Sequence, residues 1–159
     1  VLELRWHRRT ADISALDWRP TFHGAPAVDA RSGVVYAGSV DNGLYALRSE
    51  DGALVWRFEA LGRVNSTPAV AGDDVIFGSD DGALYALDAQ RGTLRWRFPT
   101  PAEVVHEPIT IGDSVYFVNA NDTVYAVSRR DATSRPASRH AHEAQRHQGL
   151  GVACVRPRR

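Results

Sequence analysis

The sequence predicts an all-β fold, a partial β-propeller of about three four-stranded blades. Tyrosine recurs at Tyr45, Tyr85 and Tyr125 and tryptophan at Trp56 and Trp96, so a forty-residue unit repeats without a gap. Each complete unit contains four short runs with the residue types of strands, separated by Gly, Asp and Asn. A period of about forty residues with four strands per unit is typical of propeller blades.

Residues 1–25 match the repeat poorly, and we expect them to be the end of a preceding blade followed by a connection. The stretch from Leu2 to Trp6 alternates apolar and polar residues as a strand does, and it resembles the fourth strand of the later repeats. From His7 to Gly24 the chain has turn residues but no clear period, which indicates a long connection.

Residues 26–128 form the predicted propeller repeats, divided into 26–66, 67–106 and an incomplete 107–128. The strands expected in the first repeat are Pro26–Asp29, Val34–Ser39, Leu44–Arg48 and Leu54–Glu59. Those of the second are Thr67–Ala71, Asp74–Ser79, Ala83–Asp88 and Leu94–Pro99. Those of the third are Pro108–Ile111, Ser114–Asn119 and Thr123–Ser128. No fourth strand is expected there, because Ala132 and Pro136 replace the glycine and tryptophan of the other repeats, and proline cannot donate to a ladder.

Glycine, aspartate and asparagine mark the expected turns. Gly72–Asp73 and Gly112–Asp113 have the composition of tight hairpins between first and second strands. The turns between second and third strands are expected at Asp41 with Gly43, at Asp81 with Gly82, and at Asn121 with Asp122. Asparagine can replace glycine in the third repeat because it tolerates a left-handed backbone.

The composition is that of a globular domain, with 43% hydrophobic residues. No apolar run is long enough to span a membrane as a helix, and no signal peptide is recognised at the start of the chain. The single cysteine, Cys154, excludes a disulfide framework within one chain and a Cys-pair metal or redox motif.

Charge is divided unevenly along the chain. Residues 1–128 contain 11 Arg and 17 Asp or Glu, whereas the tail, residues 129–159, contains 8 Arg and 2 acidic residues. A basic tail can bind nucleic acid, but this one has no aromatic residue for base stacking, so no nucleic-acid partner is predicted. Its composition favours a disordered segment, or a repeat that a shifted reading frame or a fragment boundary interrupts.

Several side chains able to perform chemistry also have a structural explanation. Paired carboxylates at Asp73–Asp74 and Asp80–Asp81 are interpreted as turn residues rather than cation ligands. The tail histidines are expected to have adventitious metal affinity only, and they are His140, His142 and His147. Neither a nucleophile elbow nor a triad order connects the remaining polar candidates, which are Ser39, Ser66, Ser79, His106 and Glu107. No catalytic residue and no metal site are predicted.

A short motif of the repeat predicts a contact between neighbouring blades. Alanine, glycine and tryptophan recur at fixed spacing as Ala46, Gly52 and Trp56, then as Ala86, Gly92 and Trp96. We expect the glycine to turn the chain between third and fourth strands and the tryptophan to bury its ring against a neighbouring blade. This Ala-Gly-Trp motif resembles the tryptophan-docking motif of the pyrroloquinoline-quinone-like (PQQ-like) repeat.

The resemblance covers residues 26–128, and residues 2–25 more faintly. PQQ-like blades occur in PQQ-dependent alcohol and glucose dehydrogenases, in the BamB lipoprotein of outer-membrane protein assembly, and in sensor or scaffold domains of bacterial kinases. The dehydrogenases hold PQQ and calcium in an eight-bladed ring and often carry an adjacent Cys-Cys pair. This chain has no Cys-Cys, about three blades and no long insertion, so neither PQQ nor calcium is expected to bind.

The compact repeats are most similar to the BamB-like group. That resemblance implies a non-enzymatic scaffold in the periplasm or at the periplasmic face of the outer membrane, which holds protein partners or unfolded outer-membrane proteins. The alternative is a fragment of a PQQ-dependent dehydrogenase. Because propellers usually close with four or more blades, about three blades leave open faces, and self-association through them is expected.

Overall fold

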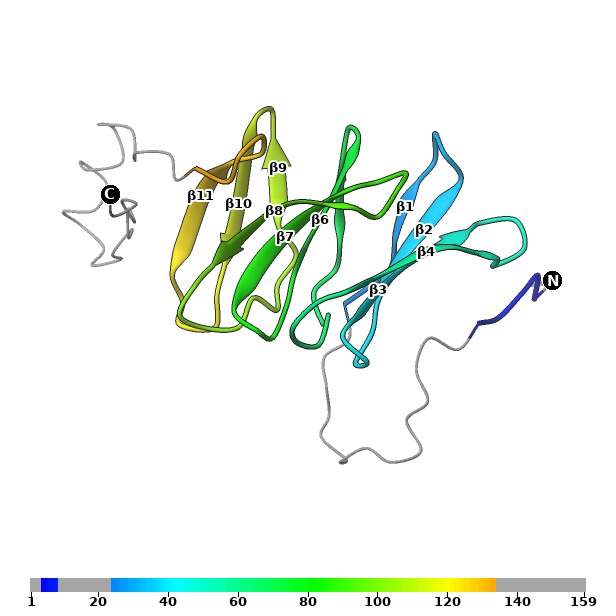
Figure 1. Ribbon diagram of the computed structural model, residues 1–159, viewed down its shortest axis with the longest axis horizontal. Coiled ribbons are helices and arrows are strands. Elements are labelled where there is room, and N and C mark those ends of the chain that lie inside the picture. The colour runs from blue at the N-terminus through cyan, green and yellow to red at the C-terminus, as the bar shows by residue number, and fades with distance from the viewer. Residues whose placement is uncertain (1–3, 9–23, 134–159) are drawn as a thin grey trace.

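The structure of this chain is a computed structural model that describes residues 4–8 and 24–133. These residues form three antiparallel sheets, which lie side by side in chain order (Figure 1). Blade 1 consists of β1 (Ala27–Asp29), β2 (Val34–Gly38), β3 (Gly43–Arg48) and β4 (Leu54–Glu59). Blade 2 consists of β5 (Ala69–Ala71), β6 (Asp74–Gly78), β7 (Ala83–Asp88) and β8 (Leu94–Pro99). Blade 3 consists of β9 (Ile109–Ile111), β10 (Ser114–Val118) and β11 (Val124–Ser128).

The expected all-β fold and its three blades are confirmed. Every strand expected within residues 26–128 is present, with ends shifted by no more than two residues. Residues 4–8, which were expected to belong to the last strand of a preceding blade, form no strand. In blades 1 and 2 each strand pairs with the next one in sequence, so both blades are four-stranded meanders. Blade 3 repeats the first three strands within the described residues.

The turns correct one detail of the sequence-based expectation. The left-handed residue between second and third strands is Asn42 in blade 1, with φ of 65°, rather than Gly43, which is the first residue of β3. The matching residue of blade 2 is Gly82, with φ of 79°. In blade 3 it is Asp122, with φ of 57°, rather than the expected asparagine, Asn121. An Asn or Asp takes this conformation at low cost, so a repeated turn does not require a repeated glycine.

The apolar core lies between the blades. One cluster joins blades 1 and 2, and its largest members include Tyr36, Phe77 and Tyr85. A second cluster joins blades 2 and 3, and it includes Trp96 and Phe117. Blade 2 therefore buries both of its faces, which explains why β6 and β7 read as nearly continuous apolar runs rather than as alternating strands.

The first strands of the blades lie next to one another, since β1 contacts β5 and β5 contacts β9. This arrangement is that of a propeller, in which first strands surround the axis and fourth strands form the outer rim. The turns that join first to second and third to fourth strands consequently lie at one end of the blades, and those between second and third strands lie at the other.

The chain termini fall mainly outside the described part. The predicted low-order tail is described only as far as Thr133, so His140, His142, His147 and Cys154 lie outside it. Of the predicted preceding blade and connection, only residues 4–8 and 24–25 are described. No helix in the described ranges could cross a membrane.

Candidate functional site

A tryptophan from one blade lies on a glycine turn of the next. The indole Nε1 of Trp56, on β4, donates to the carbonyl oxygen of Ala89 at 3.0 Å. Its ring covers Gly92, where an added Cβ would lie 2.5 Å from the indole Cδ2. Gly92 also has φ of 68°, so both backbone conformation and ring contact favour glycine. We call this arrangement a docking seam.

The same seam occurs at both neighbouring positions. Trp96 donates its Nε1 proton to the carbonyl of Arg129 at 2.6 Å, and Ala132, with φ of 56°, takes the glycine position. Before blade 1, Trp6 donates to the carbonyl of Ser49 at 2.9 Å and lies against Gly52. Three tryptophans therefore meet the turns that follow three successive third strands.

The two alanines of the Ala-Gly-Trp motif lie opposite the tryptophans of their own blade. Ala46 pairs across the ladder with Trp56, and Ala86 pairs with Trp96. Both alanines are fully buried, and the ladder shifts register directly after each of them. Gly52, Trp56, Gly92 and Trp96 thus lie in the docking seams, and Ala46 and Ala86 lie opposite the two tryptophans in the ladder.

Sequence reasoning missed a second repeated arrangement, a triad of Asp, Tyr and Arg. In blade 2 the Tyr85 hydroxyl donates to Asp81 Oδ2, Arg97 Nε donates to the Tyr85 hydroxyl at 3.0 Å, and Arg97 Nη2 pairs with Asp81 Oδ2 at 3.0 Å. Blade 1 repeats the triad with Asp41, Tyr45 and Arg57. The signal was available in the sequence, because all three residue types recur forty positions apart.

The triad sets the charge of its carboxylate. Burial acts to raise the pKa of Asp81, but hydrogen bonds from Tyr85, Arg97 and the Ala83 and Ser79 groups lower it below its ordinary value. Burial and the bond to Asp81 raise the pKa of Tyr85. The aspartate is therefore ionised and the phenol protonated at neutral pH, which suits a structural ion pair.

Asp80, its neighbour, has a different environment. Its Oδ2 accepts a hydrogen bond from Asn65 Nδ2 at 2.8 Å, while Oδ1 of each residue is buried without a partner in the described chain. Burial raises the pKa of Asp80 above its ordinary value. Val40 and Ala120 occupy the Asp80 position in the other blades, so the fold does not require a carboxylate there.

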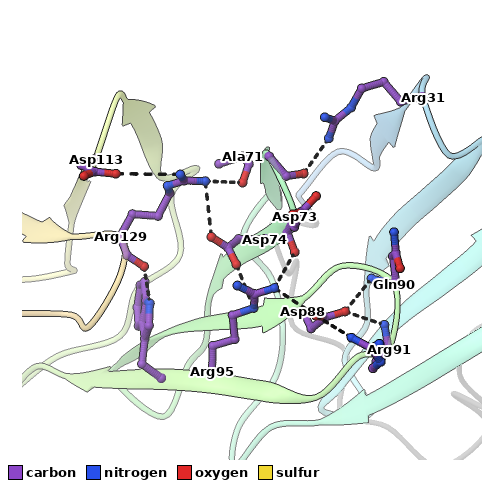
Figure 2. A network of polar contacts seen from close by, with 12 residues as sticks. Arg31, Ala71, Asp73, Asp74, Asp88, Gln90, Arg91, Arg95, Asp113 and Arg129 are labelled. Atoms are coloured by element: carbon purple, nitrogen blue, oxygen red, sulfur yellow. Dashed lines mark hydrogen bonds and ion pairs between the residues drawn. The ribbon is translucent and has the colours of Figure 1, made fainter.

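Charged side chains fill the groove between blades 2 and 3, which we call the second interblade groove (Figure 2). Arg95 on β8 pairs with Asp74 through Nε at 3.0 Å and with Asp88 through Nη2 at 2.9 Å. Arg129 reaches from blade 3 to the Ala71 carbonyl at 2.6 Å and to Asp74 Oδ2 at 3.4 Å. Burial raises the pKa of Asp74, and the two guanidinium groups only partly offset that effect.

The corresponding groove between blades 1 and 2, the first interblade groove, is open. It holds a cavity of about 470 Å³ at the end of the blades where first strands turn into second strands. The cavity is lined by two carboxylates, one arginine, one glutamine and several apolar or small residues. The lining residues are Asp29, Arg31, Ser32, Val34, Tyr36, Val55, Gly72, Asp73, Ala89 and Gln90.

Within the described residues, no hydrogen bond joins the other polar candidates to one another. Ser66 is buried and exchanges hydrogen bonds with the Gly78 backbone, at 2.7 Å from its nitrogen and 3.0 Å from its oxygen. Ser39 and Ser79 accept backbone protons in turns, and His106 and Glu107 are exposed. Across residues 4–8 and 24–133, no three His, Cys, Asp or Glu side chains gather as a metal site would require.

Comparison with known proteins identifies the repeat. A family model described as "Outer membrane protein assembly factor BamB" matches residues 3–106. No curated protein matched the chain in a sequence search.

Solved propeller structures resemble the fold. BamB from Moraxella catarrhalis matches with 23% identity and a TM-score of 0.62 over 69% of this chain and 34% of its own. The quinohemoprotein alcohol dehydrogenase ADHIIG from Pseudomonas putida HK5 matches with 24% identity and a TM-score of 0.63 over 70% of this chain and 19% of its own. A europium-containing methanol dehydrogenase matches with 20% identity and a TM-score of 0.61 over 69% of this chain and 23% of its own. These likenesses show the fold, and this chain spans about a third or less of each structure.

Proposed function

This chain belongs to the family described as outer membrane protein assembly factor BamB, and we propose that it is a non-enzymatic scaffold of the bacterial cell envelope. The single observation that carries the proposal is the family match, which spans the docking seams of blades 1 and 2. The predicted resemblance to PQQ-like repeat proteins is confirmed by the same match. The proposed partners are proteins, including outer-membrane chains before they fold, and the proposed location is the periplasm or the periplasmic face of the outer membrane.

The way the described residues use their polar groups supports a binding function rather than catalysis. The triads of Asp, Tyr and Arg and the Arg95–Asp74 pair satisfy one another within or between blades. Blades joined by short turns present rims and grooves to a partner. We assign neither PQQ nor calcium to this scaffold.

Binding to an unfolded outer-membrane protein tests the proposal. A porin diluted from urea and immobilised at low density should bind the full chain saturably, while an immobilised folded cytoplasmic protein should not. Equal binding to both surfaces, or none to the porin, would overturn the proposal.

The alternative, a segment of a quinoprotein dehydrogenase, is favoured by the likeness to two dehydrogenase structures. Its test is addition of PQQ and calcium to the purified chain, followed by absorbance spectra and dye-linked alcohol oxidation. A shifted quinone spectrum with turnover would replace the scaffold proposal, and an unchanged spectrum without turnover is the result we expect.

A further inference from the structure

We propose that the first interblade groove binds an arginine or lysine side chain of a partner polypeptide, in the position that Arg129 fills in the second groove. The inference rests on the proposed scaffold function, because the side chain comes from a bound protein. It adds a site and the chemistry of the group that the site recognises.

The second groove supplies the template. Arg129 follows β11 and points back to blade 2, where its guanidinium contacts the Ala71 carbonyl and Asp74. Nη2 of the same side chain lies 3.9 Å from Asp113 in the first turn of blade 3. One cation thus joins the end of a first strand, a carboxylate beside it and an aspartate of the next blade.

The side chains that fill the second groove are missing from the first. Forty positions earlier, Ala89 replaces Arg129, Val55 replaces Arg95 and Val34 replaces Asp74. All three replacements line the cavity of about 470 Å³. The cavity is therefore the space that two arginines and an aspartate occupy one blade later.

Carboxylates remain on both sides of this space. In blade 2, Ala71 pairs across the ladder with Asp74, and in blade 1 the matching pair is Asp29 with Val34. Cross-strand partners share a face of the sheet, so the carboxylate has moved to the other strand but stays on the same groove wall. Hydrogen bonds from Ser32 and the Arg31 backbone lower the pKa of Asp29, which keeps it ionised.

Asp73 supplies the second carboxylate and corresponds to Asp113. Asp113 pairs with Arg129 and Arg130, whereas Asp73 is exposed and forms no ion pair within the described ranges. Arg31 spans the rim, with Nε 3.3 Å from Asp29 and Nη2 2.6 Å from the Gly72 carbonyl. The charged lining of two aspartates and one arginine is therefore net negative.

The walls suit the rest of such a side chain. Val34, Tyr36 and Val55 give an apolar surface, and arginine and lysine bury their aliphatic stems on such surfaces while the charged head stays near polar groups. A cation entering beside Arg31 would reach Asp73 and the Asp29 side of the groove. An acidic ligand would meet two carboxylates instead.

The test is a titration of the isotope-labelled full chain, followed by NMR, with Nα-acetyl-arginine N-methylamide. The citrulline analogue has nearly the same shape without the charge and is the matched ligand control. We expect saturable amide shifts at Val34, Gly72 and Ala89 with the arginine probe, and binding about tenfold weaker with citrulline. Equal binding of the two probes, or no shifts in this groove, would overturn the inference.

Two variants locate the site. Ala89→Arg places the side chain of the second groove into the first, and Asp73→Asn removes the unpaired carboxylate in an exposed turn. Each should weaken binding of the arginine probe about tenfold, while Asp113→Asn in the occupied groove should leave it unchanged. Unchanged affinity in Asp73→Asn, which alters only an exposed turn, would contradict the inference. If the porin still binds while the arginine probe does not, this inference fails and the scaffold function stands.

Discussion

Adjacent carboxylates of one turn have opposite electrostatic environments. Asp81 accepts hydrogen bonds from Tyr85 and Arg97, and its pKa is lowered despite burial. Asp80 has one hydrogen bond, from Asn65, and burial raises its pKa. Sequence reasoning treated both as turn residues. Only Asp81 serves the turn through its side chain, since its Oδ1 accepts the Ala83 amide at 3.0 Å.

Replacement of Asp81 should reduce the acid sensitivity of the fold. A carboxyl group whose pKa is lowered on folding stabilises the native state above its unfolded value of 3.8, and the stabilisation disappears as pH falls through the folded value. We expect Asp81→Asn to be less stable than the parent at pH 7, with the difference shrinking at acidic pH. Urea denaturation between about pH 7 and about pH 3 measures this.

Asp80→Asn is the matched control and should have the opposite sign. A carboxylate with a raised pKa weakens the native state when it is ionised, and protonation relieves that effect as pH falls. The variant should therefore equal or exceed the parent in stability at pH 7, and lose that advantage at acidic pH. Parallel pH curves for both variants and the parent would mean that neither environment acts as described.

Ala132 is a single residue in a conformation that the other blades give to glycine. Its φ is 56°, compared with 69° at Gly52 and 68° at Gly92. A residue with a Cβ pays about 1–2 kcal/mol in this region. We expect Ala132→Gly to raise the free energy of unfolding by about 1 kcal/mol in urea denaturation. Ala126→Gly within β11 is the control and should lower it, and equal effects of the two would show that Ala132 is not strained.

At the scale of strands, the docking seam connects each blade to the next. In the seam between blades 1 and 2, the tryptophan lies on β4, and the glycine and the carbonyl acceptor lie in the turn before β8. Contacts of this kind link only neighbours in the array, so each seam contributes to one interface. We propose that Ala46, Gly52, Trp56, Ala86, Gly92 and Trp96 act in this way.

Trp96→Ala should therefore destabilise the contact between blades 2 and 3. Trp96 is only 8% exposed and packs in the second core cluster, so its removal should lower the free energy of unfolding by about 3–5 kcal/mol. Urea denaturation followed by circular dichroism measures the change. Leu94→Ala on the same strand is the control, because Leu94 is exposed and should cost little. A loss below about 1 kcal/mol for Trp96→Ala would reject the docking function.

At the scale of the whole molecule, blade 3 exposes the face by which blades 1 and 2 receive their neighbours. Tyr116 is 39% exposed. Tyr36, the equivalent residue of blade 1, is 1% exposed and donates to the Ala89 carbonyl. Val124 is also exposed, while Leu44 is fully buried at its position in blade 1. The face has the shape and residue types of an interblade contact and no blade against it in the described chain.

We expect the purified chain to self-associate through this face. Sedimentation velocity should show an average mass that rises with concentration, and Tyr116→Arg should reduce the association because it places a charge in an apolar contact. Leu61→Arg is the control, since Leu61 is 76% exposed in a connection away from this face. A monomer at every concentration, or equal association of the two variants, would contradict the expectation.

Much of the architecture was predictable from the sequence because it depends on local rules. Strand positions follow from apolar runs, and turns follow from residues that accept a left-handed backbone, as at Gly72 and Gly112. A gapless forty-residue period then predicts about three blades within this chain. The Ala-Gly-Trp motif likewise predicted a docking interaction, because its residues recur at a fixed spacing.

The sequence by itself thus determined the all-β repeat, its strands and its Ala-Gly-Trp motif. The tertiary structure decided which residues meet between blades. Trp56 selects a carbonyl 33 residues later, and Arg129 crosses to Asp74, 55 residues earlier. Such contacts depend on how twisted sheets stack, and no periodicity within one blade encodes them. The open first groove is also a tertiary feature, because its lining comes from turns and strands of two blades that are distant in sequence.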